Sequence, residues 1–107
     1  MAKIVWHVKA TKVFSDYVEN ASLEFGSKTA RRWQKERKAI EWRLERYPSS
    51  YPPEKLLVEE AVLYRQCHMM SRRFKLIYYY DEVKDVVTIM DIWDTKMNPK
   101  ALIRRIK

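Results

Sequence analysis

A histidine and a lysine lie on two neighbouring strand-like runs, where they could transfer a proton beside a phosphate. If Ser71 and Arg72 form a two-residue turn, His68 lies opposite Lys75 and both project from one face. Imidazole titrates near neutral pH and a nearby ammonium lowers its pKa, so His68 could act as acid or base beside an anion-binding Lys75. A three-residue turn would flip the register and separate them. The alternative interpretation of His68 is an ordinary exposed strand residue.

Further cations gather at the same end of this hairpin. Arg72 and Arg73 begin one strand-like run and Lys96 follows the next, so an antiparallel pairing brings them to one edge of a small sheet. Strand alternation sends Tyr79 to the face opposite its two tyrosine neighbours, which makes it a candidate for stacking on bases. The candidate catalytic residues, for a ribonuclease, are His68, Lys75 and Lys96. The candidate nucleic-acid-binding residues are Arg65, Arg72, Arg73, Tyr79 and Lys100.

Composition narrows the class of protein. The chain has 107 residues and a net charge of +8, which predicts a single domain over residues 1–107 with polyanions or an acidic protein as partners. One cysteine, Cys67, and two histidines at no recognisable metal-ligand spacing indicate neither a disulfide nor a zinc site. We expect no metal and no small-molecule cofactor. No apolar run suggests a signal peptide or a membrane span, so we expect a cytoplasmic protein with no membrane partner.

Hydrophobic periodicity predicts an α+β fold. The expected elements are a strand over 3–9, helices over 11–25 and 27–46, a proline-rich crossing over 47–55, strands from Val58 or Val62 to 69, over 73–80 and over 84–93, and a helical turn after Pro99. Short connections make the last three strands an antiparallel meander. The helical hairpin then packs on one sheet face, and we expect the other face to be exposed.

The second helix is rich in lysine and arginine. A solvated basic face with intrahelical ion pairs, such as Arg32 with Glu36, is the simpler interpretation. Trp33 and Trp42 are nine residues apart and cannot share a helix face, so we expect Trp42 to be exposed.

Several segments together resemble the RelE/ParE superfamily of bacterial toxins. They are Phe25-Gly26-Ser27-Lys28-Thr29-Ala30, Leu44-Glu45-Arg46-Tyr47-Pro48, Tyr64-Arg65, Phe74-Lys75-Leu76-Ile77-Tyr78 and Ile92-Trp93-Asp94-Thr95-Lys96-Met97-Asn98-Pro99. The resemblance implies the toxin of a type II toxin-antitoxin module, neutralised by a cognate antitoxin. It also offers a second interpretation of the basic helix, as a docking surface for an acidic antitoxin.

The two branches of this superfamily differ in chemistry. RelE-like members cut messenger RNA in the ribosome, whereas ParE-like members are associated with poisoning DNA gyrase. Lys75 and Lys96 stand where relatives often carry arginine, and lysine keeps the charge but loses bidentate geometry. RNA-cleaving relatives commonly carry tyrosine, or histidine with tyrosine, after the last strand, but residues 97–107 contain neither. This departure favours the ParE-like function over ribosome-dependent cleavage of mRNA. An inactive relative that only binds antitoxin or nucleic acid is a third hypothesis.

Overall fold

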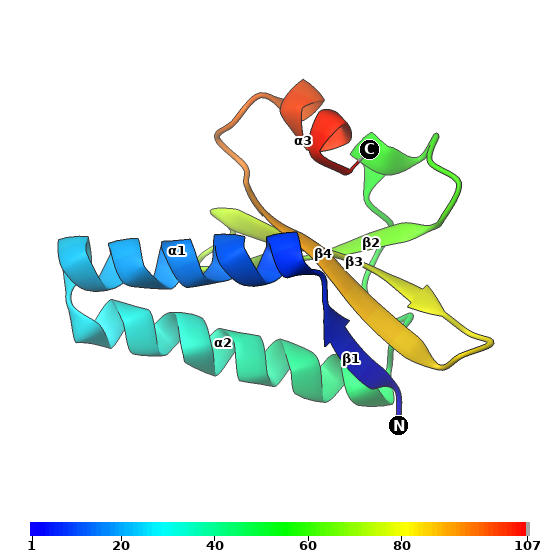
Figure 1. Cartoon of the computed structure of the whole chain (residues 1–107), viewed down its shortest axis with the longest axis horizontal. Coiled ribbons are helices and arrows are strands. Elements are labelled where there is room, and N and C mark those ends of the chain that lie inside the picture. The colour runs from blue at the N-terminus through cyan, green and yellow to red at the C-terminus, as the bar shows by residue number, and fades with distance from the viewer. Residues whose placement is uncertain (107) are drawn as a thin grey trace.

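The computed structural model describes residues 1–106 and has the predicted order of elements (Figure 1). In chain order these are β1 (Lys3–Trp6), α1 (Val8–Phe25), α2 (Ser27–Arg46), the 3-10 turn η1 (Lys55–Leu57), β2 (Tyr64–Met69), β3 (Phe74–Asp81), β4 (Val86–Asp94) and α3 (Pro99–Ile106). The first strand is shorter than predicted, because His7 caps α1 by accepting the Lys9 backbone N–H on Nδ1 at 3.1 Å. The terminal turn is longer than predicted and forms a helix of two turns.

The four strands form one sheet in the order β1-β4-β3-β2. The pairs β2–β3 and β3–β4 are antiparallel, which is the predicted meander, and β1 lies parallel to β4 with Lys3 beside Val86. A register shift between Ile77 and Tyr78 interrupts the β3–β4 ladder. The outer edge of β2 is covered by the proline crossing, where Gln66 N–H donates to the Pro52 carbonyl at 3.0 Å.

The helical hairpin packs on one face of the sheet, as predicted. Trp33 and Leu44 of α2 are buried with Phe14 of α1 against strand residues that include Leu76 and Tyr78. Gly26 joins the helices at φ 91°, a backbone conformation that residues with a Cβ rarely adopt. Trp42 is 55% exposed, as expected, and the Arg46 guanidinium lies 4.1 Å from its ring centroid.

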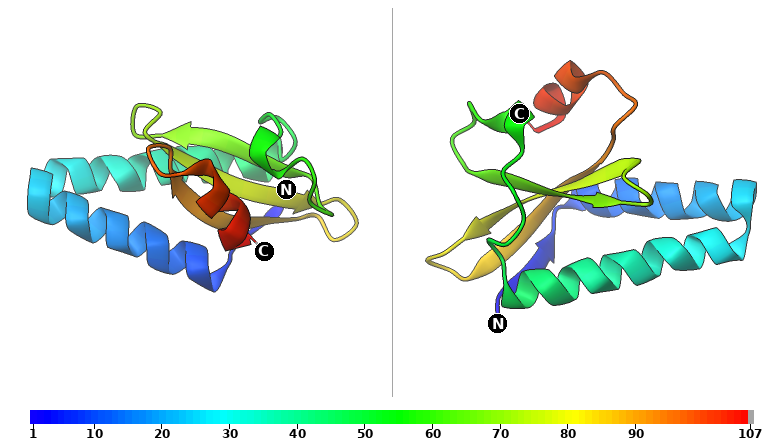
Figure 2. Two further views of the ribbon diagram at one scale, coloured as in Figure 1. Left: turned by 90° about the horizontal axis from the view of Figure 1, so that it is seen from above. Right: turned by 180° about the vertical axis from the view of Figure 1, so that it is seen from behind.

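The expectation of an exposed second sheet face was wrong. Figure 2 shows α3 and the crossing segment on the side of the sheet away from the helical hairpin. Leu102 of α3 and Leu57 of η1 are buried with Ile77 and Trp93 of the sheet in a second apolar cluster. A naked face would leave the apolar side chains of Ile77 and Trp93 in water, and α3 has one apolar stripe to cover them.

Candidate functional site

The β2–β3 hairpin has the register that brings the predicted acid-base pair together. His68 pairs with Lys75, and the turn closes where the Arg73 N–H donates to the Met70 carbonyl at 3.2 Å. Ser71 and Arg72 occupy its two central positions with φ of 57° and 70°. Positive φ at both positions matches the hand of turn that tight hairpins favour, so the conditional prediction of a two-residue turn is confirmed.

Lys75 is not a free cation in this structure. Its Nζ lies 2.9 Å from Glu54 Oε2, and the side chains of Lys75 and Glu54 are 19% and 2% exposed. The other carboxylate oxygen, Oε1, accepts the Leu56 N–H at 3.1 Å and so caps η1. A phosphate that bound Lys75 would have to compete with a buried carboxylate that is fixed by the backbone.

His68 has the protonation behaviour of a neutral imidazole. Its pKa is lowered from the ordinary 6.5, first by partial burial and then by the positive charges of Arg72 and Lys75, while Glu54 opposes them. A neutral imidazole at physiological pH can accept a proton, which is what a general base must do. His68 can therefore still act as a base, but the lysine beside it, Lys75, is already paired with Glu54.

Arg73 is also paired with a carboxylate. Its Nε and Nη2 donate to the two oxygens of Asp94 at 2.9 and 3.0 Å, a bidentate contact between the end of the β2–β3 turn and the end of β4. The Asp94 pKa is lowered from 3.8, chiefly by this hydrogen bond. Lys96 is exposed just beyond, and its backbone N–H donates to Asp94 Oδ1 at 2.9 Å. Lys96 thus sits beside the Arg73–Asp94 pair, whereas Lys75 is turned to Glu54.

A third ion pair holds α3 on the sheet. Arg105 Nη2 lies 2.7 Å from Asp91 Oδ1, and the Asp91 side chain is 1% exposed. Burial raises the Asp91 pKa above 3.8, although Arg105 opposes the shift. Lys9 of α1 reaches the same helix and donates to the Arg105 carbonyl at 2.7 Å.

The remaining predicted nucleic-acid-binding residues do not form one cluster. Arg65 donates to the Tyr51 carbonyl at 2.7 Å and so fastens the proline crossing to β2. Tyr79 packs edge-on against Tyr64 with ring centroids 5.8 Å apart, half-buried in the second apolar cluster. Lys100 is exposed in the first turn of α3, and Arg72 is exposed on the β2–β3 turn.

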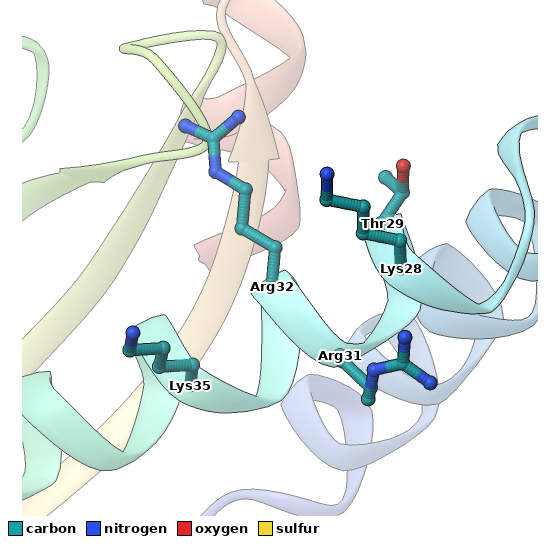
Figure 3. A pocket seen from close by; sticks show the side chains of 5 residues that line it. All are labelled: Lys28, Thr29, Arg31, Arg32 and Lys35. Carbon is teal, nitrogen blue, oxygen red and sulfur yellow. The ribbon is translucent and has the colours of Figure 1, made fainter.

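Two features of the site could not be found by reasoning from the sequence. Glu54 is 21 residues from Lys75 and lies in an irregular crossing, so no periodicity links them. The second feature is an open groove of about 780 Å³ on α2, lined by Lys28, Thr29, Arg31, Arg32 and Lys35 (Figure 3). The cation-rich sequence of this helix was the available signal, but it does not distinguish a solvated face from a binding surface.

Neither a metal site nor a membrane span is found in residues 1–106. No cluster of histidine, cysteine and acidic side chains in this range has a metal-binding arrangement. None of the helices within the same range combines the length and the apolar composition needed to cross a bilayer.

Solved structures that share this architecture include two toxin-antitoxin proteins. A chain of the chromosomal ParDE toxin-antitoxin system from P. aeruginosa aligns with a TM-score of 0.68 and 14% identity, covering 88% of this chain and 96% of that one. The isolated E. coli RelE toxin aligns with a TM-score of 0.58 and 16% identity over 100% of both chains. No family model matches the sequence, and no curated protein matches it. At this level of identity the likeness establishes the fold alone, and the chain has the RelE/ParE-type α+β fold that its sequence resemblance predicted.

Proposed function

We propose that this chain is the toxin of a type II toxin-antitoxin module and acts in the cytoplasm by binding DNA gyrase rather than by cutting RNA. A cognate antitoxin neutralises it. The fold shared with RelE and with a chain of a ParDE system supports the toxin assignment. The net charge of +8 suits a target that works on nucleic acid.

One observation carries the choice of mechanism, namely the contact between Lys75 and the buried Glu54 at 2.9 Å. Metal-free cleavage of RNA needs cations that stabilise the charge developing on the phosphate. Lys75 and Arg73 each satisfy a carboxylate instead, and the tail beyond β4 supplies no tyrosine or histidine. A non-cleaving poison needs neither a free cation here nor a proton donor in the tail.

The register of the hairpin favours ribosome-dependent mRNA endonuclease activity as the second candidate. His68 lies opposite Lys75 and its pKa is lowered, as suits a general base for the 2′-hydroxyl. In this alternative Lys96 takes the phosphate with Lys75, and Arg72 and Arg73 attract the polyanion.

Induction of the protein alone in a bacterial host, with mapping of RNA ends, separates the two candidates. We expect a growth defect with DNA-damage signalling and no codon-linked RNA ends, and inhibition of supercoiling by purified gyrase. His68→Gln keeps the size of the side chain and removes the base, so it should preserve the defect of a gyrase poison and abolish that of a nuclease. Codon-linked cuts lost in His68→Gln would reject our proposal. The absence of any growth defect would point to an inactive relative.

The antitoxin assignment has its own test. Co-expression of a small acidic or DNA-binding protein encoded in the adjacent reading frame should abolish the growth defect and co-purify with this chain. If no protein encoded beside this chain abolishes the growth defect, the assignment to a toxin-antitoxin module would be contradicted.

A further inference from the structure

We propose that the groove on α2, together with the β2–β3 turn, is a sequence-independent binding surface for the phosphate backbone of nucleic acid. The groove cations lie on α2, separate from His68 and Lys75, whereas Arg72 of the turn is close enough to His68 to lower its pKa. The proposal therefore stands whether or not the chain acts on gyrase or on RNA.

Three of the four cations that line the groove have no acidic partner in the part of the chain that the structure describes. Four of its five lining residues are exposed lysines or arginines, the fifth is Thr29, and none of the described lining residues is acidic. Figure 3 shows these side chains projecting from one stretch of α2. Lys28, Arg31 and Lys35 take part in no ion pair among residues 1–106, in contrast to Lys75, Arg73 and Arg105.

The neighbouring turn is held against this groove by two hydrogen bonds with α2 side chains that also pair with each other. Glu36 of α2 accepts the Met70 N–H on Oε1 and Arg32 Nε on Oε2, both at 2.7 Å. Arg32 Nη2 also donates to Ser71 Oγ at 2.8 Å. Glu36 thus fixes the turn, and its charge is matched by Arg32.

The clamped turn presents a further cation in a strained backbone. Arg72 is exposed at φ 70°, a conformation that costs free energy for any residue with a Cβ. Tight hairpins usually place glycine or asparagine at such positions. Arginine at this position adds a positive charge beside the α2 groove but lowers the stability of the fold. Binding of an anion would explain why an arginine stands there.

The spacing of the cations suits a phosphate backbone. Seven residues of helix separate Lys28 from Lys35, a rise of about 10.5 Å. One strand of duplex carries a phosphate about every 3.4 Å along its axis, so the groove spans roughly three phosphates. The lining consists of cationic side chains and one hydroxyl, with no aromatic ring to stack on a base and no aliphatic or aromatic residue to anchor a protein partner. We therefore favour nucleic acid over an acidic protein segment, and we expect no preference for sequence.

Fluorescence anisotropy with a labelled 20-base-pair DNA of random sequence tests the proposal. Binding at about 50 to 200 mM salt should weaken with a log-log slope near −4, which corresponds to four or five neutralised phosphates. The variant Lys28→Gln, Arg31→Gln, Lys35→Gln should lose at least tenfold in affinity and flatten the slope by about 3. The matched control Lys3→Gln, Lys55→Gln, Lys84→Gln removes the same charge from exposed positions elsewhere and should lose less than threefold.

The single variant Arg72→Gly distinguishes a loss of DNA binding from a loss of folding. It should raise the melting temperature, because glycine relieves the positive φ, and still weaken DNA binding severalfold. Equal losses from the groove and control triples would overturn the proposal, since net charge alone would then explain binding. Polyglutamate that competes as well as unlabelled DNA would also overturn it, in favour of an acidic protein partner.

Discussion

Lys75 of β3 and Glu54 of the proline crossing form an ion pair of 2.9 Å whose carboxylate is almost fully buried. The pair joins the crossing to β3, and the other oxygen of the same carboxylate caps η1. It also turns a predicted phosphate-binding lysine into a structural one. The asymmetry of burial, 19% exposure for Lys75 and 2% for Glu54, determines what each single substitution should cost.

Glu54→Gln should destabilise the fold by about 2 kcal/mol, because Lys75 keeps an oxygen acceptor and reaches water. Lys75→Met should cost more, because it leaves a buried carboxylate without its cation. The double variant should recover part of both losses, and urea unfolding of all four proteins gives the coupling energy. Costs that simply add would mean that the two side chains are not energetically linked.

The imidazole of His68 should titrate below its ordinary value of 6.5, because burial and then the charges of Arg72 and Lys75 lower its pKa. The unfolded chain then takes up the proton first as the pH falls. Stability from this group is fully present above 6.5 and declines as the pH drops toward the folded pKa. NMR titration of the ring proton measures the shift directly, and Arg72→Gly should move the midpoint back toward 6.5. A midpoint above 6.5 would contradict the assigned causes.

Asp94 should make the fold sensitive to acid. Its pKa is lowered from 3.8 chiefly by the hydrogen bond from Arg73, so its contribution is present above 3.8 and lost as the pH falls through the folded value. Asp94→Asn should lower stability only slightly at pH 7, since the Arg73 side chain is 44% exposed. The difference in unfolding free energy between Asp94→Asn and the parent should vanish in strong acid, where Asp94 is protonated. Urea unfolding at pH 7 and in strong acid measures this difference. Asp16→Asn, which breaks the exposed pair with Lys12, is the control and should have little effect.

The order of the elements was predictable because the elements follow local patterns. Period-2 and period-3.6 hydrophobicity located the strands and helices, but His68 followed opposite Lys75 only on the condition of a two-residue turn, which the structure supplies. The pairing of Lys75 with Glu54 and of Asp91 with Arg105 was not predictable, because each joins segments whose approach depends on tertiary packing. The expectation for the second sheet face was wrong for the same reason, because it also depended on tertiary packing. Leu102 lies in a short basic tail, and its burial depends on where that tail docks.

Arg105→Met should loosen α3 by removing the cation that balances Asp91. The Asp91 side chain is 1% exposed, and burial already raises its pKa above 3.8. Because the folded pKa lies above the unfolded one, stability from this group decreases as the pH rises from 3.8 through the folded value. The single variant should therefore lose about 3 kcal/mol at pH 7 and less in mild acid, where the carboxylate is neutral.

Adding Asp91→Asn to Arg105→Met should restore most of this loss and remove its pH dependence, because no buried charge remains. Hydrogen exchange locates the effect. Amides of α3 should exchange faster in Arg105→Met than those of β3, since only the apolar packing around Leu102 and the Lys9 contact are left among the described contacts to hold the helix once the ion pair is gone. Uniform acceleration across α3 and the central strands would instead mean that the helix and the sheet unfold as one unit, and that the ion pair supports the whole fold.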